Sequence, residues 1–357
     1  MVEVVKPGIE TVEIGGRRVA AHYGDPAAEY RAARGGAAVI DRSHEGRMRA
    51  VGHDRIDLLN RMSTNDLTGM AAGEARPTVL TTAIARIVDV IWVLNRGETA
   101  LCLTSPGQET PVRRWLSGYI FYGDQVKFED ASSELGQLGI YGPRAGAAAS
   151  ALVAGAEALA ENHFVEQEGL IVLRARPLAG DGFTVIAPVE RIPTLWGKAV
   201  EAGATPAGET AYQLLRLAAG EPYVGHEIAE EYIPLEANLW GAVSFTKGCY
   251  IGQEIIARME SRGKLARRLM GLKLEAPVAE GSEIRAAGAP AAVGTITTAG
   301  VLPDLGPVAL GFLKTAHAEP GTAVKVGEVG GIVVNLPFAV TVQAEPGGGT
   351  LIPLKKR

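Results

Sequence analysis

Apolar and polar positions along the first two thirds of the chain follow two different spacings. Over residues 54–62 the apolar side chains recur at helical spacing, which predicts a helix with Asp54 as its cap. Residues 78–94 and 99–104 are rich in β-branched side chains, and each segment predicts a strand. The same reasoning predicts strands over 171–174 and 182–187, and helices within 143–162 and over 193–202 and 210–219. Because these elements do not form regular βαβ units, the pattern indicates an α+β fold.

Beyond residue 262 the pattern changes to short apolar runs separated mostly by Gly, Pro or Asp. The runs cover residues 269–274, 293–297, 308–313, 323–326 and 332–336. Short strands with turn residues between them are typical of a small β-sandwich or β-barrel. We therefore expect a domain boundary near Arg262 and Gly263, with an α+β region over residues 1–262 and a β domain over 263–357.

Composition and charge narrow the class of protein. The chain has 357 residues, of which 47% are hydrophobic and 21% charged, as in an ordinary globular protein. Its net charge of −5 argues against a direct nucleic-acid binder, because such proteins usually carry a basic surface. The N-terminus does not resemble a signal peptide, and no apolar stretch is long enough to span a membrane. We therefore expect a cytoplasmic protein that does not associate with membranes.

The two cysteines, Cys102 and Cys249, lie far apart in the sequence and do not suggest a disulfide framework. No group of Cys and His residues has the spacing of a zinc or iron–sulphur site, so we expect no bound metal.

The densest group of chemically useful residues runs from Phe245 to Glu254. Two glycines bracket this segment, and the apolar residues that follow have helical spacing. The segment therefore predicts a loop that leads into a helix. The first N–H groups of such a helix favour anions, and Lys247 beside Cys249 would favour the thiolate. The alternative is a tight turn around a buried structural cysteine, because free cysteines are often buried.

A second candidate is Glu236, which follows Pro234 among apolar residues. A carboxylate in such a setting costs free energy unless it is paired or hydrogen-bonded. It can accept two parallel N–H bonds from the edge of a pterin or guanine ring. Two structural alternatives remain open: a carboxylate at a helix start near Asn238, or an ion pair with an arginine.

These residues carry a family resemblance. Residues 247–254 resemble the signature K-G-C-F/Y-x-G-Q-E of the YgfZ-type folate-binding proteins at all eight positions. Those proteins belong to the superfamily of the glycine-cleavage T-protein, an aminomethyltransferase. Shorter matches to the superfamily's D-x-S-x-x-G, T-N-D-V/L, L-R-L/I-E-A-G and closing P-F elements lie at residues 41–46, 64–67, 215–220 and 337–338. The resemblance spans roughly residues 20 to 340.

The resemblance implies a three-lobed fold around a central folate site, with two interleaved α+β lobes and a C-terminal β-barrel. It also implies tetrahydrofolate as the cofactor. Glu236 would then hold the pterin, with Tyr250 as a further contact. Either Arg262 or Lys264 would meet the anionic tail of the folate.

The chain departs from the T-protein pattern at several positions. T-proteins carry a tandem acidic pair in a strand of the form I-x-D-D-L, whereas this chain keeps only Asp89 and has Val90 at the second position. Ala218 replaces the glutamate of the L-R-L/I-E-A-G element, and Cys249 stands where T-proteins normally lack a cysteine.

These departures point away from aminomethyl transfer. The YgfZ resemblance implies an accessory role in iron–sulphur cluster assembly or repair, with iron–sulphur client proteins as partners and an indirect contribution to tRNA modification. Cys249, assisted by Lys247, would be the reactive group. The alternative is an enzyme, either a folate-dependent aminomethyltransferase or a related demethylase, in which Asp89 handles the proton. A third reading is a binding module that no longer takes folate.

Overall fold

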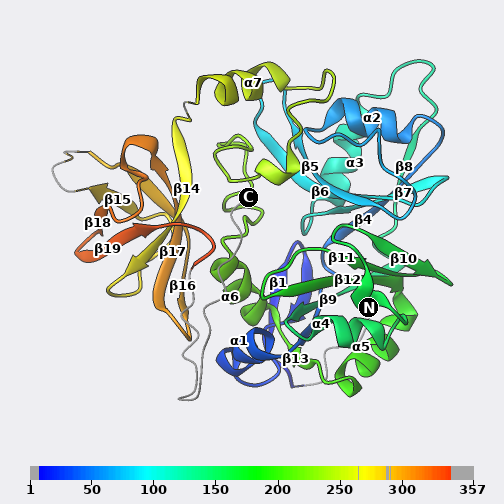
Figure 1. Ribbon diagram of the computed structural model, residues 1–357, viewed down its shortest axis with the longest axis horizontal. Coiled ribbons are helices and arrows are strands. Elements are labelled where there is room, and N and C mark those ends of the chain that lie inside the picture. The colour runs from blue at the N-terminus through cyan, green and yellow to red at the C-terminus, as the bar shows by residue number, and fades with distance from the viewer. Residues whose placement is uncertain (1–7, 264, 287–288, 290, 339–357) are drawn as a thin grey trace.

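Three bodies surround the middle of the molecule (Figure 1). The computed structural model describes residues 8–263, 265–286, 289 and 291–338. Two of the bodies are sheets flanked by helices and the third is a closed barrel, so the predicted α+β fold with a C-terminal barrel is confirmed. A short hairpin of β1 (Thr11–Ile14) and β2 (Arg17–Ala20) precedes them.

The first body is an antiparallel sheet with the strand order β5-β6-β7-β4-β8. Its strands are β4 (Gly46–Val51), β5 (Ala75–Thr81), β6 (Ile87–Asn95), β7 (Thr99–Thr104) and β8 (Lys127–Asp130). The helices α2 (Arg55–Met62) and α3 (Glu109–Ser117) bury Leu58 and Leu116 in one core cluster with Ile91 and Val93 of β6. These helices therefore cover one face of the sheet and leave β6 free to present alternate side chains to the other face.

One local prediction for this body is wrong, and a second is met in position only. Residues 78–94 are not one strand, because the chain turns at 82–86, where Ala85 takes a positive φ of 59°. The turn contains neither Gly nor Pro, so the sequence pattern concealed it. Asp54 precedes α2 but makes no capping bond; its carboxylate instead accepts the backbone N–H of Gln125 at 2.7 Å.

The second body is a sheet with the strand order β10-β11-β12-β9-β3-β13. Its strands are β3 (Ala38–Asp41), β9 (Leu135–Gly142), β10 (Phe164–Gln167), β11 (Leu170–Arg174), β12 (Asp181–Pro188) and β13 (Thr205–Ala207), and only the β13–β3 pair is parallel. Its helices are α1 (Pro26–Gly35), α4 (Ala145–Ser150), α5 (Ile192–Glu201) and α6 (Glu209–Ala219), with short 3₁₀ turns at Ala156–Ala158 and Val189–Arg191. The predicted helix within 143–162 is thus confined to α4 and one 3₁₀ turn.

The two sheets are interleaved. The strands β3 and β4 follow one another in the sequence but lie in different sheets, and the same is true of β8 and β9. The short segments that join them therefore run along the border between the two bodies, which places Arg42 to Glu45 where both sheets meet.

The third body is a closed antiparallel barrel with the strand order β14-β17-β16-β15-β18-β19. Its strands are β14 (Arg267–Leu274), β15 (Glu283–Ala286), β16 (Gly294–Leu302), β17 (Gly306–Lys314), β18 (Ala323–Val326) and β19 (Val329–Val334). The helix α7 (Gln253–Arg262) leads into it, and 3₁₀ turns lie at Trp240–Ala242 and Thr315–His317. Leu310 and Phe312 of β17 share a core cluster with Tyr212 and Leu215 of α6, so the barrel packs directly on the second body.

Gly220 ends α6 at a position that excludes any side chain. Its φ is +68°, and an added Cβ would lie 2.8 Å from Cβ of Leu336 at the end of the barrel domain. We expect Gly220→Ala to lower the free energy of unfolding by about 1–3 kcal/mol, because it adds both backbone strain and a clash. Urea unfolding monitored by circular dichroism measures the change.

Gly197→Ala is the matched control, because Gly197 lies inside α5 and an added Cβ there meets nothing within 4 Å. It should leave stability unchanged or raise it by up to about 1 kcal/mol. An unchanged stability in Gly220→Ala would contradict the assigned junction between α6 and the barrel domain.

Candidate functional site

A cavity lies in the middle of the molecule, where the two sheets and α6 meet. Its wall is built from segments that are far apart in the sequence. The lining residues are Glu45, Val90, Trp92, Ser105, Pro106, Arg176, Tyr212, Glu221, Pro222, Tyr223, Val224 and Ile228. The cavity offers about 50 Å³ of space to water-sized molecules. It combines three aromatic faces with two carboxylates and one guanidinium, a composition suited to a flat polar ring.

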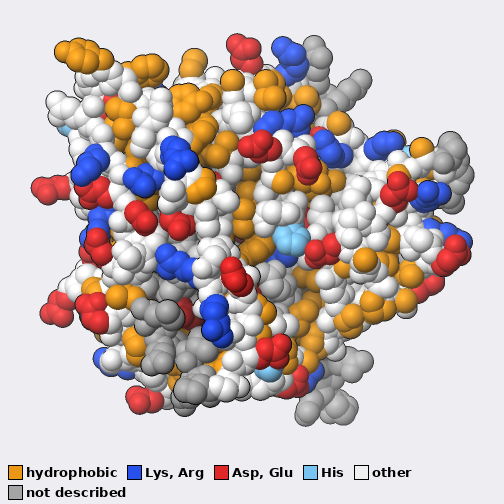
Figure 2. Space-filling view, turned by 180° about the vertical axis from the view of Figure 1, so that it is seen from behind, with side chains coloured by type: hydrophobic (Ala, Val, Ile, Leu, Met, Phe, Trp, Pro, Cys, Tyr) orange, Lys and Arg blue, Asp and Glu red, His pale blue; other side chains and the backbone are white. Residues whose placement is uncertain are grey.

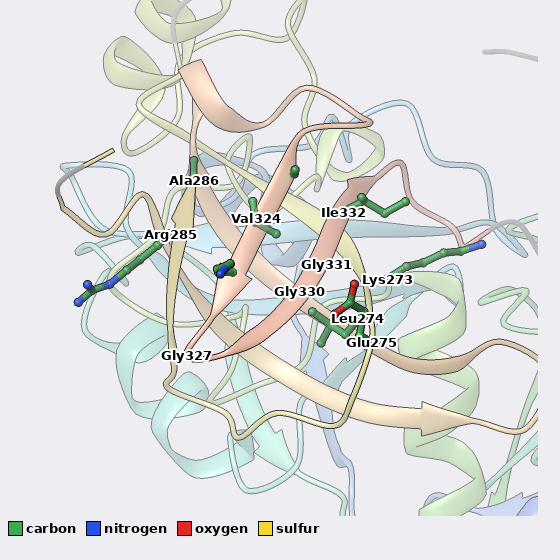
Figure 3. Close-up of a pocket in the computed structure, with 12 residues that line it drawn as sticks. Lys273, Leu274, Glu275, Arg285, Ala286, Val324, Gly327, Gly330, Gly331 and Ile332 are labelled. Atoms are coloured by element: carbon green, nitrogen blue, oxygen red, sulfur yellow. The ribbon is translucent and has the colours of Figure 1, made fainter. Parts of the chain in front are cut away.

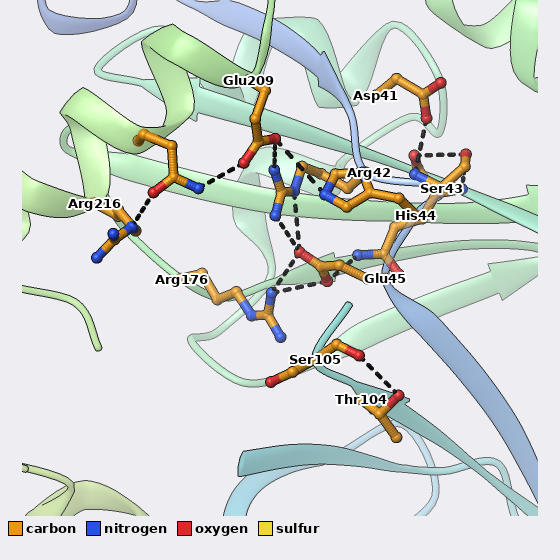
Figure 4. Close-up of polar contacts among 12 residues, drawn as sticks. Asp41, Arg42, Ser43, His44, Glu45, Thr104, Ser105, Arg176, Glu209 and Arg216 are labelled. Atoms are coloured by element: carbon orange, nitrogen blue, oxygen red, sulfur yellow. Dashed lines mark hydrogen bonds and ion pairs between the residues drawn. The ribbon is translucent and has the colours of Figure 1, made fainter. Parts of the chain in front are cut away.

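A network of buried ions holds one wall of this cavity (Figure 4). Glu45 accepts Arg42 Nε at 3.0 Å, Arg176 Nη1 at 3.0 Å and Gln137 Nε2 at 2.7 Å. Arg42 continues the chain of contacts to Glu209 on α6. Burial alone would raise the pKa of Glu45, but Arg176 and Arg42 outweigh it and lower the pKa to about 2. Glu45 therefore stays ionised at neutral pH. Its contacts link the border between the two sheets to α6 through Arg42 and Glu209.

The same arginines position the aromatic faces. The guanidinium carbon of Arg42 lies 3.5 Å from the ring centre of Tyr212, and that of Arg176 lies 5.9 Å from the ring centre of Trp92. Arg176 also has a positive φ of 57°, which is unfavourable for a residue other than glycine. Its double contact with Glu45 offsets that strain, so the wall is held in one conformation rather than left to adjust.

Asp89 lies beside the cavity but does not line it. Its Oδ2 accepts the backbone N–H of Ser105 at 3.1 Å, while its buried Oδ1 has no partner among the described residues. Burial, partly offset by the bonds from Ser105, raises the pKa of Asp89 to about 6. On β6 it is the next residue, Val90, that lines the cavity. A position that is acidic in the T-protein motif thus presents an aliphatic side chain to the cavity.

Glu236 lies apart from the central cavity. Its side chain is buried, and its Oε2 is 3.4 Å from Nε of Arg267. Arg267 also lies over the ring of Tyr232, with 5.0 Å between the guanidinium carbon and the ring centre. Of the alternatives that the sequence left open for Glu236, the ion pair with an arginine is the one that the structure contains. Arg267 could not be singled out from the sequence, where its only signal is a basic residue at the start of an apolar run.

The string around Cys249 folds as predicted, because Gly252 takes a positive φ of 83° and α7 begins at the next residue. Cys249 is exposed, so the alternative of a buried structural cysteine is wrong. Tyr250 is buried in a separate core cluster and does not line the central cavity. The cysteine and Glu236 therefore do not border the cavity that the lobes enclose.

Lys247 is a structural residue. Its Nζ donates to the backbone carbonyls of Asn60 at 2.7 Å, Ser63 at 2.9 Å and Asn65 at 2.6 Å. An ammonium has three donors, and all three are used, so the predicted assistance to Cys249 is not supported. Burial lowers the pKa of Lys247 to about 8, and the three carbonyls favour the protonated form at neutral pH.

The structure does not describe the side chains of the two residues, Arg262 and Lys264, that were expected to meet the anionic tail of the folate. Arg262 ends α7, but its side chain and the whole of Lys264 lie outside the described residues. A neighbouring cleft of about 340 Å³ contains a different basic residue, Arg268. This cleft shares Glu221 and Pro222 with the central cavity. The sequence analysis named neither Arg268 nor Glu221.

A wider cavity of about 660 Å³ lies on the barrel, between residues of β14, β15, β18 and β19 (Figure 3). Three basic residues and a single carboxylate, Glu275, line it, and one of the three, Arg285, is paired with Glu283. It shares no lining residue with the central cavity, and no aromatic side chain lines it. We therefore place the candidate site in the central cavity rather than here.

The described part of the outer surface offers no second candidate for the functional site. On the face shown in Figure 2, acidic and basic side chains are interspersed and form no basic stripe. No helix in the described residues is long and apolar enough to cross a membrane. Across residues 8–263, 265–286, 289 and 291–338, no cluster of His, Cys, Asp or Glu is arranged to hold a metal ion.

Comparison with known proteins identifies the family to which this fold belongs. The chain matches the family model for the GCVT N-terminal domain over residues 3–247 and that for the glycine cleavage T-protein C-terminal barrel domain over residues 267–343. The chain therefore belongs to the glycine cleavage T-protein family. The crystal structure of the glycine cleavage system aminomethyltransferase T from Bartonella henselae has the same fold, with a TM-score of 0.85 at 24% identity over 93% of this chain and 94% of that one.

Curated relatives agree on the family. A protein of Arabidopsis thaliana named "Putative transferase At1g60990, chloroplastic" is 33% identical over 85% of this chain and 71% of its own length. Aminomethyltransferases of Symbiobacterium thermophilum and Rubrobacter xylanophilus are 30% and 31% identical, over 90% and 96% of this chain and 90% and 94% of their own lengths.

The burial of Asp89 predicts a pH dependence of stability. Its pKa of about 6 in the folded state lies above the value of about 4 in an unfolded chain, so the folded state binds more protons between these pH values. Stability therefore falls as pH rises from about 4 to 6. We expect Asp89→Asn to reduce this fall by about 3 kcal/mol in urea unfolding. Asp57→Asn, at an exposed ion pair on α2, is the control. Parallel pH profiles for wild type and Asp89→Asn would contradict the assignment.

The contacts of Lys247 predict that it stabilises the fold without activating the thiol. Lys247→Met leaves three carbonyls without their donor, and we expect the free energy of unfolding to drop by about 2–4 kcal/mol. The pH midpoint of Cys249 alkylation by iodoacetamide should stay the same. An upward shift of that midpoint would show that Lys247 favours the thiolate after all.

Proposed function

We propose that this chain binds tetrahydrofolate in the central cavity and the cleft that adjoins it. The single observation that carries this proposal is the set of faces that meet there: Trp92, Tyr212 and Tyr223 for a flat ring, and Glu221 for ring N–H groups. The resemblance to the T-protein superfamily suggests which ring that is. Small-molecule sites usually have about 300–1,000 Å³. The central cavity, with about 50 Å³, is smaller than this, and the adjoining cleft of about 340 Å³ supplies the space in that range.

We further propose that the protein is an accessory factor for iron–sulphur cluster assembly or repair, and that it supports tRNA modification indirectly. The loss of the second acid supports this role, because Val90 cannot transfer a proton at the cavity wall. The exposure of Cys249 also supports it, because a client protein can reach this thiol directly. A single cysteine does not hold a cluster alone, so the client would supply the remaining ligands.

Aminomethyl transfer is the second candidate. It is favoured by relatives named aminomethyltransferase at 30–31% identity over at least 90% of this chain. Asp89, with a pKa of about 6 and an unpartnered Oδ1, would then handle the proton. An assay with a lipoyl-bound aminomethyl donor separates the two: turnover that is lost in Asp89→Asn establishes the enzyme, and no turnover with bound tetrahydrofolate favours the accessory role.

The accessory role predicts that ligand binding and the thiol are separable. Calorimetry should show saturable binding of tetrahydrofolate to the wild type, with an affinity that changes less than twofold in Cys249→Ala. The same variant should fail to restore iron–sulphur enzyme activity in a host strain that lacks its related protein.

Thr246→Ala is the control, because Thr246 is exposed in the same loop and should rescue like the wild type. Absence of saturable tetrahydrofolate binding would refute the folate site. Full rescue by Cys249→Ala would remove the thiol from the proposed role.

A further inference from the structure

Glu221 stands at the junction of two spaces. It follows the glycine that ends α6, and it lines both the central cavity and the adjoining cleft. Pro222 is the other residue common to both. A ligand that occupied both spaces would therefore lie against Glu221 and Pro222.

The carboxylate of Glu221 has unused capacity to accept hydrogen bonds. The backbone of Glu221 is held at both ends by Arg216, through N–H to carbonyl bonds of 2.9 and 3.4 Å. In the described part of the chain, no hydrogen bond or ion pair reaches its side-chain oxygens. The side chain of Glu221 is exposed at its surface, but many protein atoms surround it beyond contact distance. This enclosure raises the pKa of Glu221, while Arg176 and Arg216 lower it.

The other carboxylates that could bind the ligand already have side-chain partners. Glu45, the other acid in the cavity wall, accepts three side chains, Arg42, Arg176 and Gln137. Glu236, which the family resemblance assigns to the pterin, is paired with Arg267. Ala218, at the position of the glutamate in the superfamily's motif, is buried in the core. Glu221 stands three residues further along the chain.

The cleft also contains a residue of the opposite charge. Arg268, on β14, lines the cleft together with Asn238 and Asn335. No ion pair of Arg268 occurs among the residues that the structure describes. The combined lining thus offers a hydrogen-bond acceptor beside aromatic rings, and the cleft also offers a cation.

We propose that Glu221 orients the ligand by accepting two parallel N–H bonds from the amidine edge of a pterin, while Arg268 binds the anionic tail. This inference rests on the proposed folate site and assigns its two ends. A carboxylate matches the paired donors of such an edge geometrically, and a guanidinium matches a carboxylate tail. Glu236 then has a structural role, and it holds Arg267 at the start of the barrel.

The experiment compares tetrahydrofolate with p-aminobenzoylglutamate, which has the tail but no pterin, by calorimetry. Glu221→Gln should weaken tetrahydrofolate binding at least tenfold and change p-aminobenzoylglutamate binding less than twofold. Arg268→Gln should weaken both ligands. Glu221→Asp, which moves the carboxylate by one methylene, should give an intermediate affinity for tetrahydrofolate. Melting temperatures confirm that each variant is folded.

Two variants serve as controls. Glu230→Gln, at an exposed position of the same segment, and Glu236→Gln should each bind tetrahydrofolate within twofold of the wild type. If the wild type does not bind tetrahydrofolate, the proposed function fails. If the wild type binds, but Glu221→Gln binds equally well or Glu236→Gln loses affinity, the folate site stands and the assignment of Glu221 is overturned.

Discussion

The buried contact of Glu45 with Arg42 and Arg176 is the interaction on which the candidate site depends. It lies where the chain crosses from one sheet to the other, and through Arg42 it reaches Glu209 on α6. Removing one partner of such a group leaves an uncompensated buried charge, which typically costs about 3–5 kcal/mol. The arrangement therefore does more than join the lobes: it places Tyr212 and Trp92 beside guanidinium groups and fixes the wall of the central cavity.

The carboxylates discussed above are of two kinds. Glu45, Glu209 and Glu236 form ion pairs with arginines, whereas no described side chain or backbone group pairs with the carboxylate of Glu221 at the cavity. Lys247 shows the same distinction among the cations, because its three donors are consumed by backbone carbonyls. A charged residue in a family motif is thus not evidence of ligand contact. What matters is whether neighbouring groups have already satisfied it.

The sequence predicts those features whose cause is local. The barrel strands follow from short apolar runs, and the loop that leads into α7 follows from Gly252 and the helical spacing after it. The central cavity could not be predicted in this way, because its lining comes from six separate segments that only the tertiary fold brings together. The pairing of Glu236 with Arg267 was open for the same reason: the sequence shows the acid but not which base reaches it.

A crystal structure of the protein with tetrahydrofolate bound tests the central claim most directly. We expect ring density against Trp92, Tyr212 and Tyr223, with the Glu45–Arg42–Arg176 contacts unchanged from those described above. Density for the ring beside Glu236 or in the Cys249 loop, with the central cavity empty, would contradict it.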